Sequence, residues 1–79
     1  MSPTIFRHGG YRFFFFSREE SRLHVHVSCG DGEAKFWLTP EVAVAENFGL
    51  TRQQLREIAK VIEERRDEIA RAWERHFAG

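Results

Sequence analysis

The sequence has little that would cross-link the chain or hold it in a membrane. It contains one cysteine, which rules out a framework of disulfides and fits a reducing compartment. No stretch approaches the roughly 18 consecutive apolar residues of a transmembrane helix, and the first ten residues lack the apolar core of a signal peptide. We therefore expect a soluble, cytoplasmic protein that forms a single domain over residues 1–79.

An excess of charge of either sign is also missing. Twelve Lys and Arg balance twelve Asp and Glu, so no overall field attracts nucleic acid, and any basic surface must be local. Residues 1–30 hold four Arg against two Glu, together with three of the four His. The first third of the chain is therefore the place to look for a basic surface.

The clearest strand pattern lies in residues 23–38, LHVHVSCGDGEAKFWL. His24, His26 and Ser28 alternate with apolar residues, which predicts a strand with a polar and an apolar face. Asp31-Gly32 then predicts a two-residue hairpin turn, because Gly accepts a positive φ. The predicted cross-strand pairs are Cys29–Ala34, Val27–Phe36, Val25–Leu38, Ser28–Lys35 and His26–Trp37.

A second hairpin is predicted around Gly9-Gly10, with the pairs His8–Tyr11, Arg7–Arg12, Phe6–Phe13 and Ile5–Phe14. The polar loop of residues 18–22 joins the two hairpins, so we expect the strands at 11–17 and 23–29 to pair around Glu20. A slip by one residue would bury Arg7 and Arg12 at a cost of several kcal/mol for each unpaired ion. In the favoured register the core side carries Phe6, Tyr11, Phe13, Phe15, Val25, Val27, Phe36 and Leu38, with His8 and Cys29.

Residues 41–46 alternate well enough for a short edge strand, which we prefer to a helical turn, and Asn47-Phe48-Gly49 is expected to break it. Thr51 with Gln54 then forms a capping box that starts a helix over residues 52–77. Its apolar stripe lapses at residues 63–67, so the helix either runs through or bends near Arg65. The stripe consists of Leu55, Ile58, Ile62, Ile69, Trp73 and Phe77, of which we take the last two as core anchors.

The predicted fold is thus α+β. An antiparallel sheet of two β-hairpins, four or five strands within residues 4–46, is packed by the long C-terminal helix on one face. The opposite face of the sheet mixes aromatic, basic and imidazole groups. Its candidate binding residues are Arg7, Arg12, Phe14, His24, His26, Lys35 and Trp37, with Phe16 and Ser28 on the same face.

Four interpretations of this face stay open. Aromatic rings could stack bases while the cations follow phosphates, or the same mixture could form a protein interface. A small metal-free ribonuclease would use His24 and His26 as acid and base, with Arg12 and Lys35 stabilising the phosphate. Alternatively, the face is scaffold, covered by the far half of the helix or by a second copy.

A metal site is the weakest of the chemical hypotheses. His24 and His26 could offer two imidazoles to Zn²⁺, but a third ligand would have to come from His8, Cys29 or a carboxylate. The predicted register places His8 and Cys29 on the opposite side of the sheet. We therefore expect no metal and no cofactor.

Several short motifs together resemble a known family over nearly the whole chain. They are Pro3-Thr4-Ile5, Gly10-Tyr11-Arg12-Phe13-Phe14, His24-Val25-His26-Val27, Ala34-Lys35-Phe36-Trp37-Leu38 followed by Pro40, Asn47 before Gly49, and Trp73. The chain is similar to the small bacterial proteins of domain of unknown function 4160, although Leu23 stands where that family often has Pro. The resemblance implies a stand-alone protein, often encoded beside another small protein, commonly of the family numbered 2442. That layout is similar to a toxin–antitoxin module, and it implies no catalytic residue.

From these observations we expect a small binding or interaction protein, one half of a two-gene module. Its sheet face would bind a partner protein, a second copy or nucleic acid. The ribonuclease is the alternative from another class.

Overall fold

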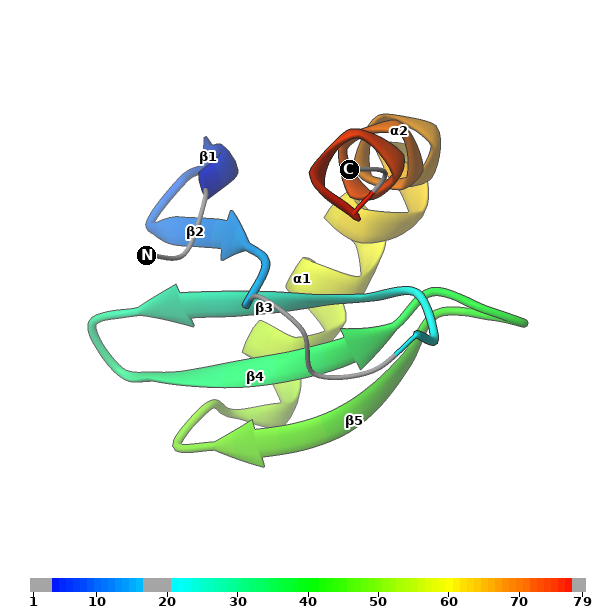
Figure 1. Cartoon of the computed structure of the whole chain (residues 1–79). Helices are drawn as coiled ribbons and strands as arrows, with labels where there is room; N and C mark the ends of the chain where they lie inside the picture. Colours follow the sequence, from blue (N-terminus) through cyan, green and yellow to red (C-terminus); the bar gives the residue numbers. More distant parts are fainter. Residues whose placement is uncertain (1–3, 17–20, 78–79) are drawn as a thin grey trace.

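The computed structural model of the chain describes residues 4–16 and 21–77. In these residues the elements are β1 (Thr4–His8), β2 (Tyr11–Phe14), β3 (His24–Cys29), β4 (Gly32–Trp37), β5 (Ala43–Phe48), α1 (Arg52–Glu64) and α2 (Arg66–Phe77). The strands form one antiparallel sheet in the order β1-β2-β3-β4-β5, so each strand lies beside its neighbour in sequence (Figure 1). The fold is α+β, as predicted, and the expected edge strand is present.

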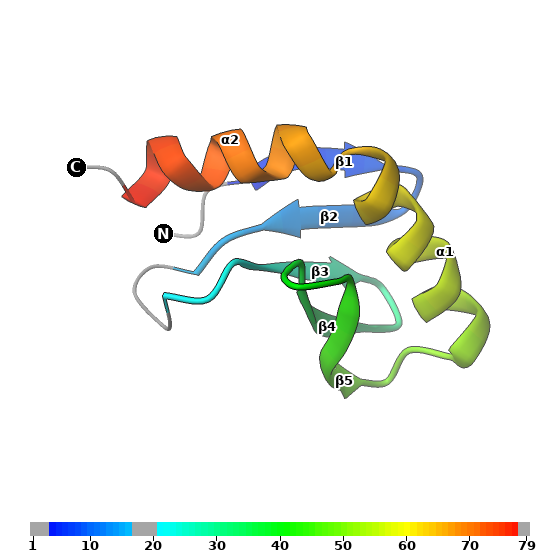
Figure 2. The ribbon, with the colours of Figure 1, turned by 90° about the vertical axis from the view of Figure 1, so that its right-hand side faces the viewer.

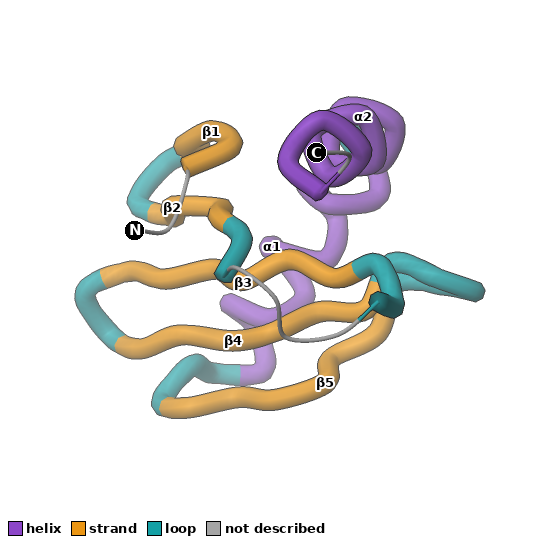
Figure 3. Tube along the Cα trace, viewed as in Figure 1, coloured by secondary structure: helices purple, strands orange, loops and turns teal. Residues whose placement is uncertain are grey.

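The helices lie in two directions against this sheet. α1 crosses behind β3, β4 and β5, whereas α2 leaves at a steep angle to it, toward the level of β1 and β2 (Figures 2 and 3). Apolar side chains from α1, α2 and the near face of the sheet form one core, with Phe13, Phe36, Ile58, Ile62 and Ile69 completely buried. The burial of these apolar side chains drives the packing of the helices against the sheet. The single cysteine cannot form a disulfide within the chain that would do so instead.

The register between β2 and β3 is the predicted one. Phe13 lies opposite Val27 and Phe14 opposite His26, so these pairs are centred on position 20. Val25, Val27 and Phe13 therefore point into the core. Each residue of these two strands lies on its predicted face, with Arg12 outside the core.

The first hairpin pairs as predicted except at its open end. His8 lies opposite Tyr11, and Phe6 opposite Phe13, but Thr4 rather than Ile5 lies opposite Phe14. A β-bulge between Thr4 and Phe6 causes the difference. The bulge lets two consecutive apolar residues, Ile5 and Phe6, both pack against the core, which a regular strand would not allow.

The second hairpin is shifted by two residues from the prediction. Cys29 lies opposite Gly32, and Val25 opposite Phe36, so the two turn residues are Gly30-Asp31 and not Asp31-Gly32. Each predicted pair is therefore wrong, although a shift of two leaves every side chain on its predicted face. Gly32 is needed for another reason: a Cβ there would overlap the carbonyl oxygen of Phe48 on the neighbouring strand.

β5 is displaced by two residues from the predicted strand of residues 41–46, because it begins at Ala43 and runs through Asn47 and Phe48. Asn47 therefore does not break the strand. Its side chain closes the turn that follows: Nδ2 donates to the Leu50 carbonyl at 3.0 Å and Oδ1 accepts from the Leu50 N–H at 3.1 Å. Gly49, with a φ of 92°, makes the break.

The capping box at the start of α1 is confirmed. The Thr51 hydroxyl accepts from the N–H of Gln54 at 3.1 Å, and Gln54 Oε1 accepts from the N–H of Thr51 at 2.9 Å. Gln54 Nε2 also donates to Asp31 Oδ2 at 2.9 Å. The cap therefore holds the start of α1 against the β3–β4 turn.

The helical region bends at Arg65, which settles the alternative left open by the sequence. Arg65 has φ −114° and ψ 26° between the end of α1 and the start of α2. The bend falls where the apolar stripe lapses, and it allows Ile69 to be buried and Trp73 to reach Phe15, with ring centroids 5.4 Å apart. Trp73 is a core anchor, as predicted, whereas Phe77 is 36 % exposed.

Candidate functional site

The face of the sheet that points away from α1 is the candidate site, and we call it the outer face. The strand register arranges its side chains in rows across the sheet. One row is Arg7, Arg12, Ser28, Glu33 and Phe48, the next is Phe14, His26, Lys35 and Glu46, and a third is His24, Trp37 and Ala43. All seven predicted binding residues therefore lie on one face of the sheet.

These residues differ strongly in exposure. Phe14, His24, His26 and Lys35 are buried within the chain, Arg12 and Trp37 are half-buried, and Arg7 is exposed. Phe14 is therefore covered within a single chain, without a partner. The side chains at the centre of the outer face are therefore inaccessible to a ligand. The accessible side chains, which include Arg7, Arg12 and Trp37, lie around that centre.

Cations lie over two of the aromatic rings of the outer face. The guanidinium carbon of Arg12 is 4.4 Å from the centroid of Phe14, and Arg12 Nε donates to the Thr4 hydroxyl at 2.7 Å. Over Trp37 lie the guanidinium of Arg22 at 4.2 Å and Lys35 Nζ at 4.7 Å. Such contacts support a cation against the ring and restrict its side chain before any ligand arrives.

Arg22 is a residue that the sequence analysis missed. Besides its contact with Trp37, its Nε donates to the Thr39 carbonyl oxygen at 2.9 Å, and its own carbonyl accepts from His24 Nδ1 at 2.7 Å. Because a carbonyl oxygen only accepts, the last contact requires the proton on Nδ1. Arg22 lies in a polar loop, two residues before β3. No periodic pattern in the sequence relates Arg22 to Trp37, so their contact could not be predicted.

The two histidines are embedded among aromatic rings. His26 lies 4.4 Å from Phe16 and 5.5 Å from Phe14, and His24 lies 5.0 Å from Trp73, measured between ring centroids. His24 is 1 % exposed and His26 6 %. Trp73 comes from α2, so the far half of the helical region helps to cover the outer face, one of the arrangements that the sequence left open.

Within residues 4–16 and 21–77, no three His, Cys, Asp or Glu side chains gather closely enough to hold a metal ion. His24 and His26 lie 5.3 Å apart between ring centroids, and Cys29 belongs to the core side of β3. The two imidazoles are therefore neighbours, but the described residues supply no third protein ligand for a metal ion.

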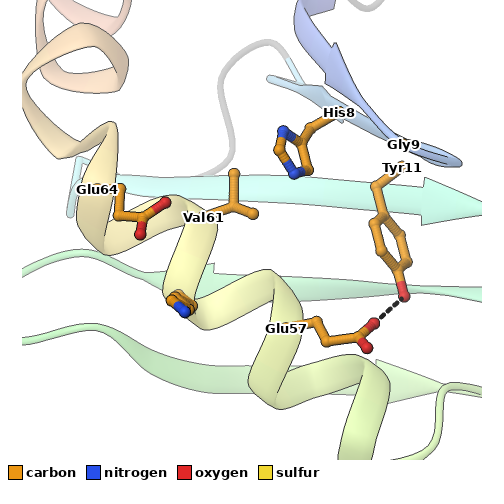
Figure 4. A pocket seen from close by; sticks show the side chains of 7 residues that line it. His8, Gly9, Tyr11, Glu57, Val61 and Glu64 are labelled. Carbon is orange, nitrogen blue, oxygen red and sulfur yellow. Dashed lines mark hydrogen bonds between the residues drawn. The ribbon is translucent and has the colours of Figure 1, made fainter.

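A separate cavity of about 410 Å³ opens on the opposite side of the sheet, between the first hairpin and α1 (Figure 4). His8 and Tyr11 line it from the sheet, and Glu57 and Glu64 from the helix. Tyr11 donates a hydrogen bond to Glu57 Oε1 at 3.2 Å. Partial burial raises the pKa of the Tyr11 hydroxyl above 10.0, and the hydrogen bond to Glu57 and the charge of that carboxylate raise it further.

Comparison with known proteins places this architecture in a family. Residues 10–74 match the family described as Domain of unknown function (DUF4160). The chain belongs to this family. No curated protein and no solved structure matches the chain.

The part of the chain shared with the DUF4160 family runs from the turn before β2 into α2. It includes Trp73 and every residue of the outer face except those contributed by β1, such as Arg7. The aromatic and cationic outer face is thus carried almost entirely by the part of the chain that matches the family.

Among the described helices, none has the length and apolar character needed to cross a membrane.

Proposed function

We propose that this DUF4160 protein is a small interaction protein that binds a partner protein through the outer face of its sheet. The observation that carries the proposal is the support of Arg12 and Arg22 over aromatic rings, at 4.4 Å from Phe14 and 4.2 Å from Trp37. Arg and Trp are the side chains most enriched in interface hot spots. Here their conformations are restricted in advance, which lowers the entropic cost of binding.

The signs of the charges favour a protein over nucleic acid. Glu33 lies in the same row as Arg7 and Arg12, and Glu46 lies directly opposite Lys35. A phosphate backbone would meet both carboxylates, whereas a protein can complement both signs. We therefore rank a protein partner above single-stranded nucleic acid.

The layout implied by the family resemblance leads to a specific partner. We propose that this chain is one half of a two-gene module similar to toxin–antitoxin pairs, and that the small neighbouring protein is its partner. The even charge balance of the whole chain fits this role, because it leaves recognition to local surfaces.

The ribonuclease alternative gains no support from the geometry. A general acid or base must come within about 2.6–3.2 Å of the proton that it transfers, directly or through a water. His24 and His26 are 1 % and 6 % exposed among aromatic rings, so a substrate would have to displace their neighbours to reach them. We assign both histidines a structural role.

The test is calorimetric titration of the neighbouring gene product into the wild-type protein and into two variants, Trp37→Ala and Arg22→Ala. Both variants should bind the partner more weakly than the wild type. For Trp37→Ala the loss of binding free energy should be about 2 kcal/mol, as for a hot-spot residue. Arg71→Ala is the matched control, because Arg71 is exposed on α2 and belongs to none of the strand rows that form the outer face. Each variant is first shown to fold by its thermal melt.

Two outcomes would contradict the proposal. Unchanged affinity in folded Trp37→Ala and Arg22→Ala proteins would remove the outer face as the binding surface. Tight binding of a single-stranded oligonucleotide, with a salt dependence that falls by about one unit in Arg12→Ala, would make nucleic acid the ligand.

A further inference from the structure

An apolar groove of about 320 Å³ lies on the helix side of the sheet, between β5 and α1. Val44 lines it from β5, Val42 from the residue directly before this strand, and Leu55 and Ala59 from the helix. Val44 remains 45 % exposed although its cross-strand partner Phe36 is completely buried. The core therefore continues into an open groove at this side of the molecule.

The strand beside the groove has a free edge. In the described part of the chain, β5 is the last strand of the sheet and pairs with β4 alone. Alternate residues of this six-residue strand direct their backbone donors and acceptors to the side away from β4. Added strands use such an edge: backbone hydrogen bonds supply affinity, and pockets for alternate side chains supply specificity.

The charge at the groove is of one sign. Arg52 and Arg56 line it, both are exposed, and no acidic side chain is among its lining residues. They stand four residues apart in the first turns of α1, where the helix dipole is positive and the first turn holds no acid. Like charges at this spacing destabilise a helix, so an anionic occupant would relieve a repulsion present in the free protein.

These observations select among occupants. A second copy that paired its own β5 antiparallel along this edge would place both α1 helices on the same face of the joined sheet. Their positive N-terminal turns, with Arg52 and Arg56, would then approach one another, which disfavours that arrangement. A nucleic acid would complement the two arginines but would neither fill the apolar groove nor pair with the strand edge.

We propose that the β5 edge and this groove form a docking site for an extended segment of a partner protein in which apolar and acidic residues alternate. The segment adds as a strand beside β5. Its apolar side chains enter the groove, and its carboxylates meet Arg52 and Arg56. The site lies on the opposite side of the sheet from the outer face, so it goes beyond the proposed function and does not depend on it.

The probe is a synthetic peptide of about eight residues that alternates valine and glutamate, the length of an ordinary strand. Its binding is measured by fluorescence anisotropy to the wild-type protein and to Arg52→Glu/Arg56→Glu. The double variant should bind at least about tenfold more weakly, since two attractive contacts become repulsive. It should fold normally, because acidic residues are favourable in the first turn of a helix.

Arg71→Glu/Arg75→Glu is the matched control, with the same charge change at the same spacing on the exposed surface of α2. It should leave the affinity for the peptide within about twofold of wild type, as exposed charges far from a binding site do. A peptide with N-methyl groups on alternate amides should fail to bind, because it keeps the charge but loses the backbone hydrogen bonds.

Three results would overturn the proposal. An equal loss in both double variants would mean attraction by net charge alone, and normal binding of the methylated peptide would exclude strand addition. Sedimentation showing that the free protein is a dimer strengthened by Arg52→Glu/Arg56→Glu would make a second copy the occupant. Failure of the Trp37→Ala test described above would leave this site unaffected, so the two surfaces are judged separately.

Discussion

Arg66 donates a hydrogen bond from Nη2 to the carbonyl oxygen of Leu38, at 2.6 Å and across 28 residues of sequence. The same nitrogen donates to the Pro40 carbonyl at 3.2 Å. Arg66 is the first residue of α2, directly after the bend, and Leu38 is completely buried directly after β4. The bend between the helices is therefore attached to the end of a central strand.

We expect Arg66→Ala to lower the free energy of unfolding by about 1.5–3 kcal/mol, the range for hydrogen bonds that involve a charged group. Urea unfolding measures the difference. Arg71→Ala is the control and should change stability by less than about 0.5 kcal/mol, as exposed substitutions do. Equal stability of the two variants would mean that apolar packing, including that of Ile69 and Trp73, positions α2 without this hydrogen bond.

Phe36→Ala should be far more disruptive, because Phe36 is completely buried and lies opposite Val25 and Val44 in the middle of the sheet. Removing such a ring costs about 3–5 kcal/mol, which is comparable to the whole stability of a small domain. Phe48→Ala makes the same substitution on β5, where the ring is 63 % exposed, and should be nearly neutral. Thermal melts of both variants test this, and a midpoint for Phe36→Ala close to that of the parent would contradict the described core.

Tyr11 makes stability depend on pH in the alkaline range. The chain has a single tyrosine, so the absorbance of tyrosinate reports on Tyr11 alone. Burial and the Glu57 carboxylate raise its pKa in the folded state above 10.0, so the unfolded chain loses this proton first as the pH rises. The contribution of protonated Tyr11 to the free energy of unfolding is therefore complete below pH 10.0. It is lost as the pH rises through the pKa of Tyr11 in the folded state.

Spectrophotometric titration should therefore show a midpoint above that of free tyrosine. In Glu57→Gln the midpoint should move back toward 10.0, because the amide can still accept the hydrogen bond but carries no charge. The same midpoint in wild type and Glu57→Gln would show that the carboxylate does not act on Tyr11 in solution.

His24 and His26 should not bind zinc at stoichiometric levels, since the described residues around them supply no third protein ligand. Elemental analysis of protein purified without chelator measures the metal content. About one zinc ion per chain, lost in both His24→Ala and His26→Ala, would overturn the structural role assigned to these residues.

Local chemistry was readable from the sequence because each signal lies within a few residues. Thr51 and Gln54 identify the start of α1 since a capping box needs only those two side chains at that spacing. The lapse of the apolar stripe at residues 63–67 marked the bend for a similar reason, because that turn has no apolar side chain to bury. The faces of β2 and β3 followed from the parity of their pairing and the high cost of burying Arg7 and Arg12.

The remaining features depend on contacts between segments that lie far apart in the sequence. The register of the second hairpin could not be predicted, because a shift of two residues keeps every side chain on its face and leaves the alternation unchanged. In the true register Gly32 lies in β4 against Phe48, which belongs to another strand and leaves no room for a Cβ. The covering of His24 by Trp73, and the position of Arg22 over Trp37, likewise exist only once α2 and the loop before β3 have taken their places. Alternation along a strand is local, so it predicted which side chains share a face, whereas burial depends on the whole chain and controls which of them remain accessible.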